Sequence, residues 1–142
     1  MANTSLNTQP IYTASADTQW IGSATTANTT KDLTSGTAYL AFTASATGGG
    51  YVQRLRLRPL GTNVASLARI FINNGGATGT TANNILWDEV TLPATTNSET
   101  SALPTYEIPL NFALPPGYRI FVTIATGVAA GFGITVIGGK YA

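Results

Sequence analysis

The sequence predicts an all-β protein that folds as a single antiparallel β-sandwich. Short stretches rich in β-branched and aromatic residues recur along the 142-residue chain, and clusters of Gly, Asn, Pro, Ser and Thr separate them, which is the pattern of strands joined by turns. No stretch carries a convincing helical stripe of apolar residues. For eight or nine strands of this kind a jelly roll is the favoured form of the sandwich, and an immunoglobulin-like sandwich is the alternative.

Nine strands are expected after a polar N-terminal segment. Residues 1–10 end at Pro10 and are predicted to be a flexible arm, whereas residues 11–142 are predicted to be one β-sandwich domain. The stretch 64–72 holds alanines that allow a turn of helix, but the Asn-Asn-Gly-Gly after it favours a strand that runs into a turn. The predicted strands lie at 11–14, 18–23, 37–43, 51–58, 67–72, 85–92, 106–112, 118–125 and 132–137.

Prolines mark two positions in the second half of the chain. Pro109 lies inside the segment 106–112 and would cost a central strand one ladder hydrogen bond. This segment is therefore predicted to be an edge strand or to bulge at the proline. The Pro-Pro-Gly sequence at 115–117 predicts a turn that opens the strand at 118–125.

The uncharged run at 120–139 is long enough to cross a membrane. Its glycines and threonines, and the β-branched residues that alternate at both ends, favour two strands and a turn instead. The formal net charge is only +1, so neither nucleic acid nor an anionic membrane is expected as the main partner. The N-terminus has no basic stretch and no apolar run, so no secretory signal is predicted and synthesis in the cytoplasm is expected.

Composition argues against catalysis. The chain has no cysteine and no histidine, which removes thiolate nucleophiles, the usual acid–base residue and most zinc and copper sites. Asp88 and Glu89 are adjacent and should face opposite sides of a strand, so they do not form a catalytic pair. The nucleophile motif GxSxG, phosphate-binding glycine loops and calcium-binding loops do not occur. We therefore expect a protein that is not an enzyme and has no cofactor and no metal site.

The sequence YVQRLRLRPLG at 51–61 places Arg54, Arg56 and Arg58 at every second position. Alternate residues of a strand share a face, so these side chains form a row at intervals of roughly 7 Å, with the intervening leucines and Tyr51 on the opposite face. Arginine forks pair with carboxylates and phosphates, so the row could dock a partner such as an acidic neighbouring subunit. The favoured interpretation is a solvated face that discourages edge-to-edge aggregation.

Two tryptophans and the N-terminal arm supply the other candidates for partner binding. Trp20 and Trp87 are expected in the core or at a subunit interface, and on the surface they would be platforms for sugar stacking. Asn3, Thr4 and Leu6 of the arm, together with Trp20 and the arginine row, are the candidate contacts with a partner.

The C-terminal third, residues 85–142, contains the sequences LPPGY at 114–118 and IGGKY at 137–141. With these motifs it resembles the end of small β-rich virion proteins of tailed bacteriophages, in which a glycine-rich hairpin closes a β-sandwich. The resemblance implies a capsid decoration (cement) protein in the virion, assembled in the host cytoplasm. It also implies a homotrimer whose partners are the major capsid protein or other virion subunits.

The first functional hypothesis is therefore a structural virion protein that stabilises the head shell. The alternative is a glycan- or receptor-binding module of a tail or head fibre, which would use exposed Trp or Tyr side chains beside polar loops.

Overall fold

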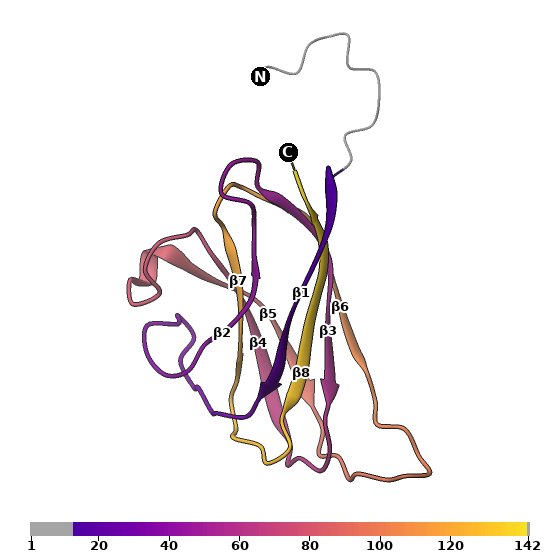
Figure 1. Ribbon diagram of the computed structural model, residues 1–142. Coiled ribbons are helices and arrows are strands. Elements are labelled where there is room, and N and C mark those ends of the chain that lie inside the picture. The colour runs from indigo at the N-terminus through magenta and orange to yellow at the C-terminus, as the bar shows by residue number, and fades with distance from the viewer. Residues whose placement is uncertain (1–12, 142) are drawn as a thin grey trace.

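A computed structural model describes residues 13–141 of the protein. The chain folds as a β-sandwich (Figure 1). Two four-stranded antiparallel sheets face each other: the first sheet has the strand order β1-β8-β3-β6, and the second has the order β2-β7-β4-β5. The predicted all-β antiparallel sandwich is thereby confirmed. No helix among the described residues is long and apolar enough to span a bilayer. The elements are β1 (Ser15–Ala24), β2 (Tyr39–Thr43), β3 (Gly50–Pro59), β4 (Ser66–Asn73), the short 3-10 helix η1 (Thr81–Asn83), β5 (Asn84–Leu92), β6 (Tyr106–Leu114), β7 (Arg119–Ile124) and β8 (Phe132–Lys140).

Eight of the nine predicted strands overlap an observed strand, including the stretch at 67–72, which is β4 and not a helix. The separate strand predicted at 11–14 is wrong over its described half, because Thr13 and Ala14 lie outside any strand. The backbone N–H of Ala14 donates to the carbonyl of Lys140 at 2.7 Å. This segment therefore leads directly into β1 and does not form a strand of its own.

The core lies between the sheets and is built from alternate residues of facing strands. On β7 the alternate side chains point into this core, whereas Phe121 points away from it and packs with Leu33 and Phe71 in a second, small cluster. Leu33 belongs to the segment that joins β1 to β2, so the centre of the second sheet is covered on both faces. Burial on both faces explains why β7 reads as a nearly continuous apolar run. The largest fully buried side chains are Phe42, Phe71, Phe132, Leu55, Leu57, Ile70, Leu92, Ile120, Ile124, Ile134, Val52 and Val122.

Pro109 lies on an edge strand, as predicted, because β6 is the last strand of the first sheet. The register between β3 and β6 also shifts beside it: Val52 pairs with Phe112, but Arg54 pairs with Pro109. Because of the edge position and the bulge, no neighbouring strand requires the N–H donor that proline lacks.

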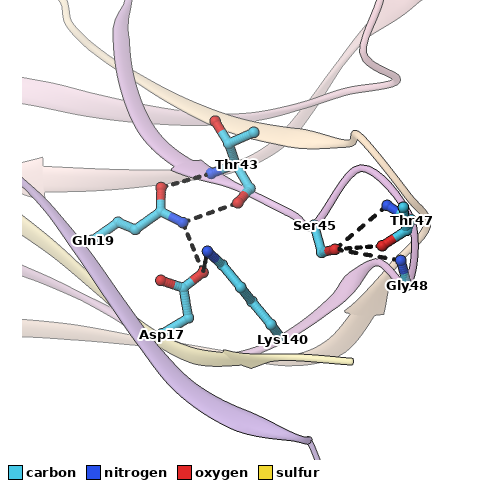
Figure 2. Close-up of polar contacts among 7 residues, drawn as sticks. All are labelled: Asp17, Gln19, Thr43, Ser45, Thr47, Gly48 and Lys140. Atoms are coloured by element: carbon cyan, nitrogen blue, oxygen red, sulfur yellow. Dashed lines mark hydrogen bonds and ion pairs between the residues drawn. The ribbon is translucent and has the colours of Figure 1, made fainter. Parts of the chain in front are cut away.

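The edges of the two sheets are joined by one side chain where β1 lies beside β2 (Figure 2). The Gln19 side chain donates from Nε2 to the carbonyl of Thr43 and accepts at Oε1 from the Thr43 N–H, both at 2.9 Å. The same Nε2 donates to Asp17 Oδ2 at 2.9 Å, and this carboxylate lies 3.7 Å from Lys140 Nζ. Gln19 thus continues the hydrogen-bonding pattern of β2 with a side chain from the opposite sheet.

Replacing Gln19 with alanine is expected to lower the free energy of unfolding by about 2 kcal/mol, because the N–H and carbonyl of Thr43 both lose a partly buried partner. Urea denaturation of the full-length protein measures the change. Gln53→Ala is the matched control, because Gln53 is exposed and its replacement should change stability by less than about 0.5 kcal/mol. Equal stabilities of the two variants would contradict this role of Gln19.

Candidate functional site

The outer face of the first sheet brings together candidates from distant parts of the sequence. Trp20 on β1 pairs with Thr135 on β8, and Thr135 pairs with Arg56 on β3. These three side chains point away from the core, since their neighbours on each strand point into it. Neighbouring strands are about 4.8 Å apart, so the Cα atoms of Trp20 and Arg56 are roughly 10 Å apart. We call this surface the arginine face.

The arginine row lies on this face, as its spacing predicts, while Leu55 and Leu57 are fully buried. The expectation that Tyr51 shares the leucine face is wrong. A register shift between Val52 and Arg54 inserts one extra residue into β3, so the alternation reverses and Val52 becomes the buried residue.

The charged side chains of the arginine face are exposed and only loosely paired. Glu107 Oε1 lies 3.9 Å from Arg54 Nε and 4.0 Å from Arg56 Nε, and the three side chains are 42–47% exposed. Neither distance is a hydrogen bond, and ion pairs this open contribute about 0–1 kcal/mol. Of the three arginines in the row, Arg58 alone makes a side-chain hydrogen bond within the described residues, from Nη1 to Thr105 Oγ1 at 3.1 Å. The guanidinium N–H groups of Arg54 and Arg56 therefore remain available to a partner.

A shallow hollow of roughly 410 Å³ lies beside the row. Arg56, Arg58 and Leu60 line it from β3 and the residue after it, Thr135 lines it from β8, and Gly133 contributes no side chain to fill the space. Leu60 is 49% exposed although it is apolar. The hollow thus combines two cations, a hydroxyl and an apolar contact within reach of one small group.

Sequence patterns alone missed Leu60, Gly133, Thr135 and Glu107. Glu107 on β6 and both Gly133 and Thr135 on β8 are far from the arginine row in the chain, and Leu60 lies just after the end of β3. Alternation predicts that Thr135 and Glu107 face outward on their own strands, but it does not say that these strands flank β3.

Both tryptophans are exposed, so of their two expected places, the core and a subunit interface, the core is wrong. Trp20 is 71% exposed and Trp87 is 49% exposed. Trp87 lies at a register shift of the edge strand β5 and packs on Phe112 of β6, with ring centroids 4.9 Å apart. It therefore closes the gap between two sheet edges, whereas Trp20 stands on a flat face that the described residues leave open.

Two charged groups outside the arginine face, Arg69 and Asp32, have structural partners. Arg69 is 8% exposed and donates from Nε to Glu89 Oε1 at 2.8 Å. Hydrogen bonds from the hydroxyl and the N–H of Thr34 hold the pKa of Asp32 below its ordinary value. Residues 13–141 contain no group of three or more His, Cys, Asp or Glu that could hold a metal ion.

The candidates Asn3, Thr4 and Leu6, and the whole predicted arm at 1–10, lie outside the described residues. The described candidates, Trp20 and the arginine row, share one face. Comparisons of the chain with protein-family models, with curated proteins and with solved structures found no match, so the arginine face is interpreted from its own chemistry.

Proposed function

We propose that the protein is a structural component of a tailed bacteriophage particle, a capsid decoration (cement) subunit that binds the head shell without catalysis. The observation that carries the proposal is the arginine face, where Trp20 stands beside two arginine guanidinium groups that have no hydrogen-bond partner within residues 13–141. Tryptophan and arginine are the residue types most enriched among energetically dominant interface contacts. The resemblance of residues 85–142 to small phage virion proteins supplies the biological setting.

We further infer that the sandwich is a jelly roll. Strands β1, β3, β6 and β8 lie in the first sheet and the others lie in the second, so only the connection from β4 to β5 stays within one sheet. An immunoglobulin-like sandwich would pair its first two strands in one sheet. Here β1 pairs with β8 and β2 pairs with β7, an order that supports the double Greek key of a jelly roll.

The mechanism of such a subunit is adhesion. Each copy would place one arginine face on a shell protein, and a homotrimer would apply three faces at once. Linked contacts raise the overall affinity without any new chemistry, because the second and third contacts form at high effective concentration. The bound subunits would add free energy that holds neighbouring shell proteins together.

Binding to particles of the encoding phage that lack the protein tests this function. The full-length protein is expected to bind such particles saturably, and Trp20→Ala should weaken binding about 30-fold, the equivalent of a contact worth about 2 kcal/mol. Trp87→Ala is the control, because this tryptophan packs on Phe112 and lies away from the arginine face. Failure of the unmodified protein to bind these particles would refute the proposed function.

A glycan-binding module of a tail or head fibre is the second candidate. The exposed ring of Trp20, across β8 from the polar hollow, favours it, since sugars stack on aromatic rings while their hydroxyls bond to nearby polar groups. A glycan array would identify it by a signal that Trp20→Ala removes and Trp87→Ala keeps. Binding to phage particles without any glycan signal would favour the decoration subunit.

A further inference from the structure

We propose that the arginine face binds an extended acidic segment of a protein partner, and that Glu107 occupies a position that a partner carboxylate takes on binding. This inference rests on the proposed function for the identity of the partner as a neighbouring protein subunit. It adds the chemistry that the face recognises and the residue that limits its affinity.

The charge balance of the arginine face selects an acidic partner. Three arginines and one glutamate leave a charge of +2 on this face, whereas the whole chain has +1. All other charged residues together therefore sum to −1. Arg58 is flanked across the sheet by Gly133, which has no side chain to neutralise it. The positive field of the protein is thus concentrated on one side, where it would steer an acidic surface.

The spacing of the row fits an extended segment. Arg54, Arg56 and Arg58 project at intervals of roughly 7 Å, the interval between alternate side chains of any extended chain. A partner strand with carboxylates at every second position would meet each guanidinium in turn, and each pair would form charge-assisted, bidentate hydrogen bonds. Nucleic acid is the weaker match, because three arginines release few counterions and the chain as a whole is nearly neutral.

Glu107 shows where such a carboxylate would lie and why the site is incomplete without a partner. Its Oε1 atom lies nearly midway between Arg54 and Arg56, at 3.9 and 4.0 Å, and hydrogen-bonds to neither. Arg54 Nε is shielded from solvent and has no hydrogen-bond partner in the described residues. A buried donor left unpaired is unfavourable, so a partner carboxylate that displaces Glu107 would satisfy a group that Glu107 leaves unbonded. Glu107 would also repel and compete with that carboxylate.

Titration of the full-length protein with a short peptide in which glutamate alternates with threonine tests the inference. The peptide is expected to bind, and a peptide with glutamine at the same positions should not. The double variant Arg54→Gln/Arg56→Gln should weaken binding about tenfold or more and flatten its salt dependence. Glu107→Gln should strengthen binding about threefold, because it removes a competing charge worth under about 1 kcal/mol. Lys31→Gln, an exposed cation outside this face, should leave binding unchanged.

Several results would overturn the inference. These are absence of peptide binding, weaker binding by Glu107→Gln, an equal loss with Lys31→Gln, or tighter binding of a single-stranded oligothymidylate than of the peptide. Thermal unfolding of each variant verifies that the exposed substitutions leave the fold intact. An unchanged affinity of the Arg54→Gln/Arg56→Gln variant for phage particles would refute this inference and leave the proposed function standing. If the protein binds the peptide but does not bind the particles, the proposed function is refuted and the acidic-segment chemistry of the arginine face is supported.

Discussion

Replacing Asn63 with alanine is expected to lower the free energy of unfolding by about 3 kcal/mol. Asn63 is 2% exposed and lies between β3 and β4. Its side chain donates from Nδ2 to the Gly131 carbonyl at 2.9 Å and accepts at Oδ1 from the N–H groups of Ala130 and Gly131, at 2.9 and 3.0 Å. Its backbone pairs with that of Thr95. One residue therefore joins three connections at one end of the sandwich, and alanine would leave the polar backbone groups of Ala130 and Gly131 without their side-chain partner.

Urea denaturation measures this loss, with the free energy of unfolding taken at unchanged m-value. Asn97→Ala is the control, because Asn97 is exposed and only its backbone N–H is bonded, to Thr62 Oγ1. Asn97→Ala should change stability by less than about 0.5 kcal/mol. A loss below about 1 kcal/mol for Asn63→Ala would show that its three side-chain bonds do not hold the β3–β4 and β7–β8 connections together.

Replacing Gly138 with alanine is the other substitution with a large expected effect, a loss of about 3 kcal/mol or more. A Cβ atom at this position would overlap with the backbone carbonyl oxygen of Tyr51 and lie 3.2 Å from the Cα of Val52. The register shift of β3 against β8 lies at this position, where the backbones of the two strands approach closely. A neighbouring side chain could move aside, but a strand backbone can yield only by giving up ladder hydrogen bonds.

Gly22→Ala is the matched control for Gly138→Ala. Gly22 also lies in a strand, and a Cβ atom there would meet nothing within 4 Å. Alanine at this position restricts the unfolded chain and should stabilise the protein by up to about 1 kcal/mol. Differential scanning calorimetry of both variants measures the contrast, and a melting temperature of Gly138→Ala equal to that of Gly22→Ala would contradict the close approach of β3 and β8.

Much of the fold could be predicted from local patterns. Alternating apolar residues located eight strands, and Pro109 correctly indicated an edge position with a bulge. The pattern failed where a residue is inserted into a strand: the bulge after Val52 reversed the face of Tyr51. A bulge leaves no reliable mark in the sequence of a single strand, because it is defined by the pairing with the neighbour.

The candidate site could be predicted only in part. The outward orientation of Arg54, Arg56 and Arg58 followed from the leucines between them. The exposure of Trp20 did not follow, because an apolar side chain beside Ile21 looks the same whether its face is covered or open. Its position across β8 from Arg56, and that of Glu107 between two arginines, required the strand order.

By itself the sequence determined that this is a β protein, which residues each strand directs inward, and that one strand carries a row of arginines, because these properties depend on neighbours in the chain. Only the tertiary structure decided that Trp20, the arginine row, Glu107 and the hollow beside Gly133 form one surface. The physical reason is that the order of strands is set by pairings between distant segments, and the local periodicity of a strand does not specify its partners.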